Sequence, residues 1–286
     1  TGQGISDLKK GVIRTPIDAK SSFLDDPLRT LRAIRFAARY GYKMAPEVID
    51  GMKDKDVQNA LQNKISAERI LKELKEALQK DPVMTVKTLT DTGLSNTFIP
   101  ELSAMDMDQK NKYHDKTVLN HTLGLLEHIH KIDPNNLALK WAALLHDVGK
   151  PKAAKPNPKN PDQLMFVGHE EESAQIAEDI FQRLRLDKAT ANKALKLIKD
   201  HGMDANPNWS EQKFNSWLFS HFKTKEEWDN WNKLREADIT ASSPAYYNEN
   251  MGHHKEIVAR ANQIVDKIIG MKPFLSGEEI KQALNN

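Results

Sequence analysis

The sequence contains no cysteine. This absence excludes disulfide bridges, thiolate metal ligands and cysteine nucleophiles, and it is typical of a chain that works in the reducing cytoplasm. Long apolar runs are also absent: none approaches the roughly 20 residues that a membrane-spanning helix needs, so we expect no membrane partner. The sequence therefore predicts a cytoplasmic localisation and leaves only nitrogen and oxygen atoms as strong metal ligands.

A strong excess of charge is missing as well. The 42 lysines and arginines nearly balance the 40 aspartates and glutamates, which leaves a formal net charge of +2. Any contact with nucleic acid must therefore come from a local basic patch and not from the charge of the whole chain. The 286 residues are enough to bury a sizeable core and suggest about two domains.

Helical periodicity dominates the sequence, and it predicts a mainly α fold class. Strand-like alternation is limited to residues 11–17 and 164–167. The first clear helix is expected to begin at Asp26-Pro27, an N-cap followed by proline, and to end at Tyr40 before Gly41. Further helices are expected over residues 67–80, 81–93, 117–131, 135–147, 170–184, 188–200, 211–221, 225–241, 249–270 and 277–284. Residues 150–163 carry four lysines and four prolines, and we expect a mobile basic loop there.

One face of the first predicted helix carries the side chains of Arg29, Arg32, Arg35 and Arg39. Their spacing of three, three and four residues places them on an arc of roughly 120°. Stacked guanidinium groups repel one another, so they need carboxylate or phosphate partners. The residues alone leave two interpretations open: an ordinary solvated face, or a surface that binds the phosphates of a nucleotide or of RNA.

The sharpest signal is the segment Leu144-Leu-His-Asp-Val-Gly-Lys150, in which an apolar helix brings His146 and Asp147 to its C-terminal end. Adjacent helical residues point about 100° apart, so both reach one metal ion only at a helix end or a distorted turn. Imidazole and carboxylate ligands without thiolate suit Mn, Fe, Ni, Mg or Zn. The other candidate ligands are His121, His169, His201 and Asp238.

This order of histidines and aspartates resembles the HD phosphohydrolase superfamily. The resemblance implies core metal ligands at His121, His146, Asp147 and Asp238, with His169 and His201 as the additional ligands of two-metal members. It also implies phosphoester hydrolysis with a divalent ion (Mg, Mn, Ni or Co), in which His146 and Asp147 are catalytic and Lys150 neutralises a substrate phosphate.

Other lysines and histidines near these motifs have less specific interpretations. Lys152, Lys155 and Lys159 are expected either to share the phosphate-binding role of Lys150 or to serve only solubility. Five histidines match no motif and are expected at the surface: His128, His130, His221, His253 and His254.

The run from Phe23 to Arg39 resembles the E-D-x-x-R motif of class II CCA-adding enzymes and bacterial poly(A) polymerases, with Asp25 where the motif has glutamate. The resemblance implies that Asp26 and Arg29 read the base edge of an incoming CTP or ATP, while Arg32, Arg35 and Arg39 contact RNA. Residues 4–16 are similar to the hinge that joins head and neck in that family, and residues 65–74 look like its neck motif with Glu68, Arg69 and Glu73.

The family resemblance implies four parts. Residues 1–24 are a hinge remnant of a head domain, residues 25–108 a helical neck and body that binds nucleotide and tRNA, residues 109–205 the HD core, and residues 206–286 a helical tail that completes the HD site through Asp238. The metal-binding carboxylates and the Gly-Ser phosphate loop of the family's head have no counterpart here, so we expect a piece of a longer protein or a separate head-domain polypeptide. Four tryptophans lie in the helical tail, and we expect them to form its packed core rather than to stack on RNA bases: Trp209, Trp217, Trp228 and Trp231.

The predicted function is therefore part of a tRNA 3′-terminal CCA-adding nucleotidyltransferase. Its expected partners are the tRNA 3′ end, CTP and ATP together with a head domain, and 2′,3′-cyclic or 2′-phosphorylated nucleotides as substrates of the HD phosphohydrolase. Two alternatives remain open at the level of the sequence: a free-standing HD nucleotide phosphohydrolase, and a non-catalytic RNA-binding module.

Overall fold

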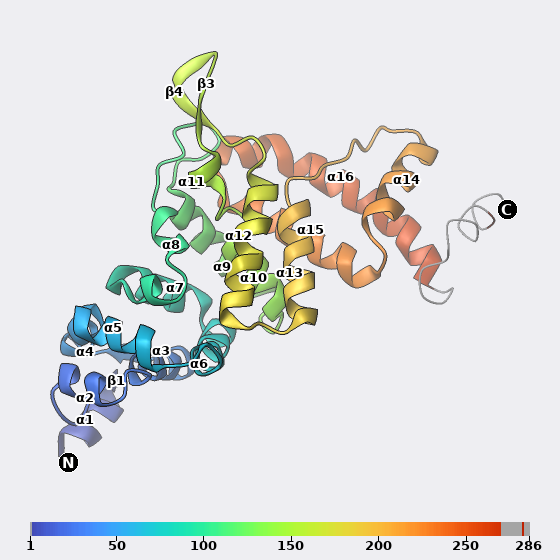
Figure 1. Cartoon of the computed structure of the whole chain (residues 1–286). Coiled ribbons are helices and arrows are strands. Elements are labelled where there is room, and N and C mark those ends of the chain that lie inside the picture. Colours follow the sequence, from blue (N-terminus) through green and yellow to red (C-terminus); the bar gives the residue numbers. More distant parts are fainter. Residues whose placement is uncertain (1, 270–281, 283–286) are drawn as a thin grey trace.

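The structure, a computed structural model, describes residues 2–269 and residue 282, and this part of the chain is built almost entirely from helices (Figure 1). The expected mainly α fold class is confirmed. A group of short helices lies at the N-terminal end, a helical bundle occupies the centre, and the long last helix runs through the C-terminal side. None of the described helices combines the length and the apolar content that crossing a bilayer requires.

The N-terminal group contains seven short helices: α1 (Gly2–Lys10), α2 (Ala19–Asp25), α3 (Arg29–Tyr40), α4 (Pro46–Lys53), α5 (Lys55–Lys64), α6 (Ala67–Lys80) and α7 (Pro82–Thr92). Two short parallel strands accompany them, β1 (Val12–Ile13) and β2 (Lys43–Met44). The bounds of α6 and α7 confirm the expected helices. Asp81 accepts a hydrogen bond from the Met84 N–H, and Gly93 ends α7 with a left-handed φ of 81°.

The start of this group differs from the prediction in two places. Residues 2–10 form a helix, although only strand-like alternation was expected near them. The helix predicted from Asp26 begins three residues later, because Asp26 ends α2 with an extended backbone. The Asp26 carboxylate instead accepts the Leu28 N–H at 3.2 Å and so caps the turn that leads into α3.

The centre and the C-terminal side follow the expected order of helices. Two short elements, η1 (Leu94–Thr97) and α8 (Glu101–Ala104), lead into them. The remaining helices are α9 (Val118–Ile132), α10 (Leu137–Leu145), α11 (Lys150–Ala153), α12 (His169–Leu184), α13 (Lys188–Asp200), α14 (Glu211–His221), α15 (Lys225–Ala241) and α16 (Pro244–Ile269). The helix expected over residues 277–284 lies outside the described residues.

The prediction of a loop over residues 150–163 is wrong. This segment begins with α11 and continues into an antiparallel hairpin of β3 (Lys155–Asn157) and β4 (Asn160–Met165), which projects from the bundle in Figure 1. Three prolines and two asparagines among residues 155–165 interrupt the period-two pattern that would have indicated strands. A hydrogen bond from the Leu164 N–H to the Lys110 carbonyl, 3.3 Å long, fixes the hairpin to the preceding loop.

The tail packs around aromatic side chains. Trp228 and Trp231 are each 1% exposed and stack with ring centroids 5.5 Å apart, and Trp217 meets both rings edge-on. The packing interpretation of these three tryptophans is confirmed. The expected surface position of His254 is wrong, because its side chain is buried and its Nε2 lies 2.8 Å from Asn232 Oδ1.

Candidate metal centre

Six side chains from five helices and their ends meet inside the central bundle. His121 lies in the first turns of α9 and Asp238 near the end of α15. The remaining three histidines occupy helix ends: His146 follows α10, His169 opens α12, and His201 follows α13. The six side chains are the metal ligands expected from the sequence: His121, His146, Asp147, His169, His201 and Asp238.

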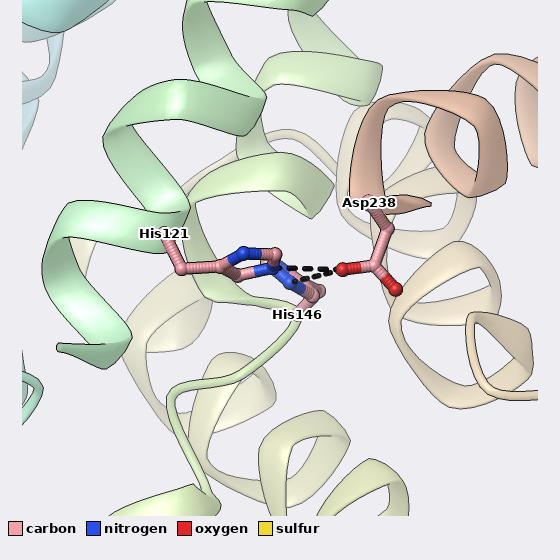
Figure 2. A group of neighbouring side chains, drawn as sticks. All are labelled: His121, His146 and Asp238. Atoms are coloured by element: carbon pink, nitrogen blue, oxygen red, sulfur yellow. Dashed lines mark hydrogen bonds and ion pairs between the residues drawn. The ribbon is translucent and has the colours of Figure 1, made fainter. Parts of the chain in front are cut away.

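These side chains form two groups of potential ligand atoms. In the first, the Asp238 group, Asp238 Oδ1 lies 2.8 Å from His121 Nε2 and 3.7 Å from His146 Nε2 (Figure 2). In the second, the Asp147 group, Asp147 Oδ1 lies 3.2 Å from His169 Nε2 and 3.5 Å from His201 Nε2. Within each group the ligand atoms lie within 4.8 Å of one another, a spacing that allows them to surround one ion.

Asp147 connects the two groups. Its second oxygen, Oδ2, faces the Asp238 group, at 3.2 Å from His146 Nε2 and 3.9 Å from His121 Nε2. The position after the end of α10 explains this reach, because a residue beyond the last helical turn is not confined to the 100° offset of helical neighbours. One carboxylate thus offers one oxygen to each group.

Three of the histidines are fixed in the same way. In each, Nδ1 donates a hydrogen bond to the backbone carbonyl three residues earlier: His146 to Ala143 at 2.8 Å, His169 to Phe166 at 2.8 Å, and His201 to Ile198 at 2.5 Å. A carbonyl can only accept, so in the neutral imidazole the proton sits on Nδ1 and the lone pair on Nε2. All three Nε2 atoms therefore face the centre as potential metal ligands.

The environment of His146 indicates that the centre is built for a cation. Its Nε2 is buried and makes no well-aligned hydrogen bond among the described residues, while two carboxylates face it: Asp147 Oδ2 at 3.2 Å and Asp238 Oδ1 at 3.7 Å. Burial opposes protonation, but the carboxylates of Asp147 and Asp238 outweigh it and raise the pKa of His146 to about 10. Burial raises the pKa of Asp147, but the positive charges of His146 and Lys150 outweigh this effect and hold the pKa of Asp147 well below its usual range. A nitrogen and oxygen donor set with this negative potential fits a divalent metal ion.

Lys150 is turned into the protein. It is 5% exposed, its Nζ lies 2.9 Å from Asp147 Oδ2, and it donates a hydrogen bond of 2.7 Å to Gln109 Oε1. The loop lysine Lys152 pairs with Glu172, whereas Lys155 and Lys159 are exposed on the hairpin. Lys150 therefore belongs to the centre and the other three lysines do not contact its ligands.

The arginine face of α3 finds carboxylate partners on α6. Glu73, a residue of the expected neck motif, lies 2.7 Å from Arg35 Nε and 3.7 Å from Arg32 Nε. Glu76 lies 3.0 Å from Arg35 and 3.6 Å from Arg39. The structure therefore places this face in an ion-pair network in the N-terminal group of helices.

The two residues expected to read a nucleotide base also have internal partners. Arg29 lies 3.1 Å from Asp25 and donates to the Ser22 carbonyl at 3.2 Å. Asp26 pairs with Arg32 at 3.1 Å. Both side chains remain partly exposed at the start of α3.

Sequence reasoning missed three side chains that surround the ligands: His114, Arg235 and Tyr246. The His114 ring packs edge-on against His121 with centroids 5.3 Å apart. Arg235 lies 3.6 Å from Asp238 Oδ2, and the spacing of one helical turn between them is a signal that would have found it. Tyr246 belongs to another helix, and its place beside the centre follows only from tertiary packing.

Comparison with known proteins places these features in a family. The HD domain model matches residues 118–264, more than half of the chain, and a second model, "Probable RNA and SrmB- binding site of polymerase A", matches residues 41–105. The chain is 32% identical over 206 residues to the Multifunctional CCA protein of Pseudomonas fluorescens, covering 69% of this chain and 47% of the relative. It is 37% identical over 132 residues to the mitochondrial CCA tRNA nucleotidyltransferase of Saccharomyces cerevisiae, covering 42% of this chain and 24% of the relative.

The fold has a counterpart among solved structures. The Bacillus stearothermophilus CCA-adding enzyme in complex with CTP aligns with a TM-score of 0.51 and 20% sequence identity, covering 90% of this chain and 52% of that one. At this identity the likeness concerns the fold alone. The chain spans no more than about half the length of these three proteins.

Proposed function

Because this chain belongs to the HD domain family and is homologous to the CCA-adding enzymes, we propose that it combines a metal-dependent phosphohydrolase with the nucleotide-selecting and tRNA-binding part of a tRNA CCA-adding nucleotidyltransferase. The observation that supports the hydrolase best is the shared position of Asp147 between two buried groups of ligands. We propose 2′,3′-cyclic and 2′-phosphorylated nucleotides as its substrates.

In this proposal the residues of the centre divide their roles. The Asp238 group would hold one divalent ion, and the Asp147 group a second, with Asp147 shared between them. A bound divalent ion supplies an acidified water and polarises a phosphoryl oxygen. His146, His169 and His201 are kept in the ligating tautomer by their backbone carbonyls. Lys150 holds the Asp147 carboxylate in place, so its catalytic contribution is to orient this shared ligand and to add positive charge beside a substrate phosphate.

The N-terminal part of the proposal concerns nucleotide addition. Asp26 and Arg29 would select CTP or ATP, and Arg32, Arg35 and Arg39 would contact tRNA, together with a head domain that supplies the polymerising carboxylates. Because Glu73 and Glu76 already hold these arginines, a bound phosphate has to compete with two carboxylates. Four exposed apolar side chains in the N-terminal helices offer a surface that a head domain would cover: Ile5, Leu8, Phe36 and Tyr40.

In this proposal the chain has the four parts that the family resemblance implies: residues 1–24, 25–108, 109–205 and 206–286. Asp238 lies in the last of these and yet contacts His121 of the third. The proposal therefore requires that the HD core and the tail fold as one unit.

The hydrolase is tested by incubating the metal-loaded chain with 2′,3′-cyclic AMP in the presence of Mg, Mn, Ni or Co. We expect hydrolysis by the wild type and its loss in Asp147→Asn, while Asp229→Asn, which changes an exposed carboxylate of α15, is expected to keep full activity. A folded wild-type chain without activity in any of these metals would favour the RNA-binding module.

The nucleotide-addition part is tested with tRNA that lacks its CCA end, plus CTP and ATP. We expect tRNA binding that excess tRNA competes and free nucleotides do not, and no incorporation by this chain alone. Nucleotide incorporation without an added head domain would contradict the proposal, and absence of tRNA binding would favour the free-standing phosphohydrolase.

A further inference from the structure

The two carboxylate oxygens of Asp238 have different partners. Oδ1 points to the centre, at 2.8 Å from His121 Nε2, whereas Oδ2 lies 3.6 Å from Nη1 of Arg235. Arg235 precedes Asp238 by one turn of α15 and is 8% exposed. A guanidinium on Oδ2 restrains rotation of the carboxylate and leaves Oδ1 for the centre.

Arg235 is in turn supported from α16. Its guanidinium interacts with the side chain of Tyr246, in the first turn of that helix. The Tyr246 ring also stacks on His114, with centroids 6.3 Å apart and an interplanar angle of 27°. Because His114 packs edge-on against His121, Tyr246 contacts the supports of two members of the Asp238 group at once.

The position of Tyr246 is fixed by the backbone. Ser243, which is buried, donates its N–H to the Tyr113 carbonyl at 3.0 Å and its hydroxyl to the Lys112 carbonyl at 3.2 Å. The Ser243 hydroxyl also accepts the Tyr246 N–H at 3.2 Å. The start of α16 is thereby attached to the loop that carries His114.

From these contacts we infer that Arg235 and Tyr246 are positioning residues that set the metal affinity of the Asp238 group, Arg235 by orienting Asp238 and Tyr246 by holding Arg235 and His114. The inference rests on the proposed function, because it assumes that this group binds a divalent ion. It assigns to α16 a role at the centre, although no residue of α16 belongs to either group of ligands.

A purely structural role of Arg235 and a positioning role differ in their effect on metal affinity. Arg235 is buried beside Asp238, so its loss would lower stability in either case. Only a positioning role also lowers the affinity of the folded chain for the ion, because an unrestrained carboxylate has to be ordered on binding. Loss of groups that orient metal ligands typically lowers metal affinity by about 10- to 100-fold.

The test is titration of the metal-free, full chain with Mn²⁺ by calorimetry, with thermal unfolding measured in parallel. We expect Arg235→Met to weaken Mn²⁺ binding by about 10- to 100-fold, Arg235→Lys to restore part of it, and Tyr246→Phe to weaken it by a smaller factor. Tyr247→Phe is the matched control, since Tyr247 is the exposed neighbour on α16, and it should bind as the wild type does.

Wild-type affinity in Tyr246→Phe and in a folded Arg235→Met chain would overturn the inference, even if both variants melt at lower temperature. If Arg235→Met does not fold, the conservative Tyr246→Phe and Arg235→Lys variants decide the question alone. A wild type that binds none of Mn²⁺, Ni²⁺ or Co²⁺ would overturn the proposed function and the inference together. If the wild type binds Mn²⁺ and the variants bind it equally tightly, only the inference is overturned.

Discussion

Asp147 Oδ1 lies 3.2 Å from Nε2 of His169, so the carboxylate that follows His146 also serves a histidine of a different helix. Asp147→Asn should therefore affect both groups of ligands, whereas Asp238→Asn should affect only one. We expect Asp147→Asn to remove both bound Mn²⁺ ions or to weaken both by about 100-fold, and Asp238→Asn to spare the ion of the Asp147 group. Metal content after dialysis checks this, and equal losses in the two variants would contradict the shared role of Asp147.

The close approach of the turn after His146 to α12 gives a second prediction. A Cβ added to Gly149 would lie 2.5 Å from the Ser173 backbone nitrogen and 2.9 Å from the Glu172 carbonyl carbon, so alanine has no room there. Gly149→Ala should push α12 and His169 away from Asp147, at a cost of about 1–3 kcal/mol in unfolding free energy and most of the hydrolase activity.

Gly252 of α16 provides the matched control for that substitution. A Cβ at this position meets nothing within 4 Å, and the residue lies inside a long helix. Gly252→Ala should therefore raise the unfolding free energy by about 0.5–1 kcal/mol without changing activity. Urea unfolding and the cyclic-nucleotide assay measure both effects, and an unchanged activity in Gly149→Ala would show that the contact does not position His169.

The buried His254 predicts a dependence of stability on pH. Burial lowers its pKa to about 4 from 6.5, with nearby Arg235 acting in the same direction. Between these two values the unfolded chain binds a proton here that the folded chain does not, so stability falls as the pH falls from about 6.5 to about 4. The full effect corresponds to about 3 kcal/mol. In His254→Gln this part of the acid destabilisation should disappear, which urea unfolding at pH 7.5 and pH 4.5 would show as a smaller difference than in the wild type.

The arginine face predicts a salt-dependent interaction with tRNA. Arg32→Ala combined with Arg39→Ala should weaken binding and reduce the slope of log affinity against log salt by up to about two units. These two arginines suit the test better than Arg35, because Arg35 is the main partner of the buried Glu73 and its loss would leave a buried charge unpaired. Lys188→Ala, which changes an exposed lysine at the start of α13, is the control, and an unchanged slope in the double variant would leave the face with a structural role only.

The sequence predicted those features that depend on neighbours along the chain. Asp81, Pro82 and Gly93 mark the ends of α7 by local capping, and the residues around His146 form a motif in one short segment. The fact that His121 and Asp238 would meet followed from the family resemblance and not from the residues themselves. Their contact at 2.8 Å depends on how α9 packs against α15.

The features that were missed depend on tertiary contacts or on weak patterns. Tyr246 reaches the centre only because Ser243 attaches α16 to the loop around His114, a relation that no periodicity reveals. The partner of Arg35 could be narrowed to a carboxylate or a phosphate, but only the packing of α3 on α6 identified it as Glu73. Most of the hairpin was hidden because its composition is that of a loop, and only its end at residues 164 and 165 fell in a segment with strand-like alternation.

The contact between His121 and Asp238 joins residues that are 117 positions apart. During synthesis on a ribosome, His121 and His146 therefore leave the exit tunnel well before Asp238, the carboxylate that completes their group. A nascent chain that stalls before Asp238, or a product cut before it, would carry five of the six ligands and still have an incomplete Asp238 group. Metal capture by that group therefore reports that translation has passed α15 and that the last helices have docked.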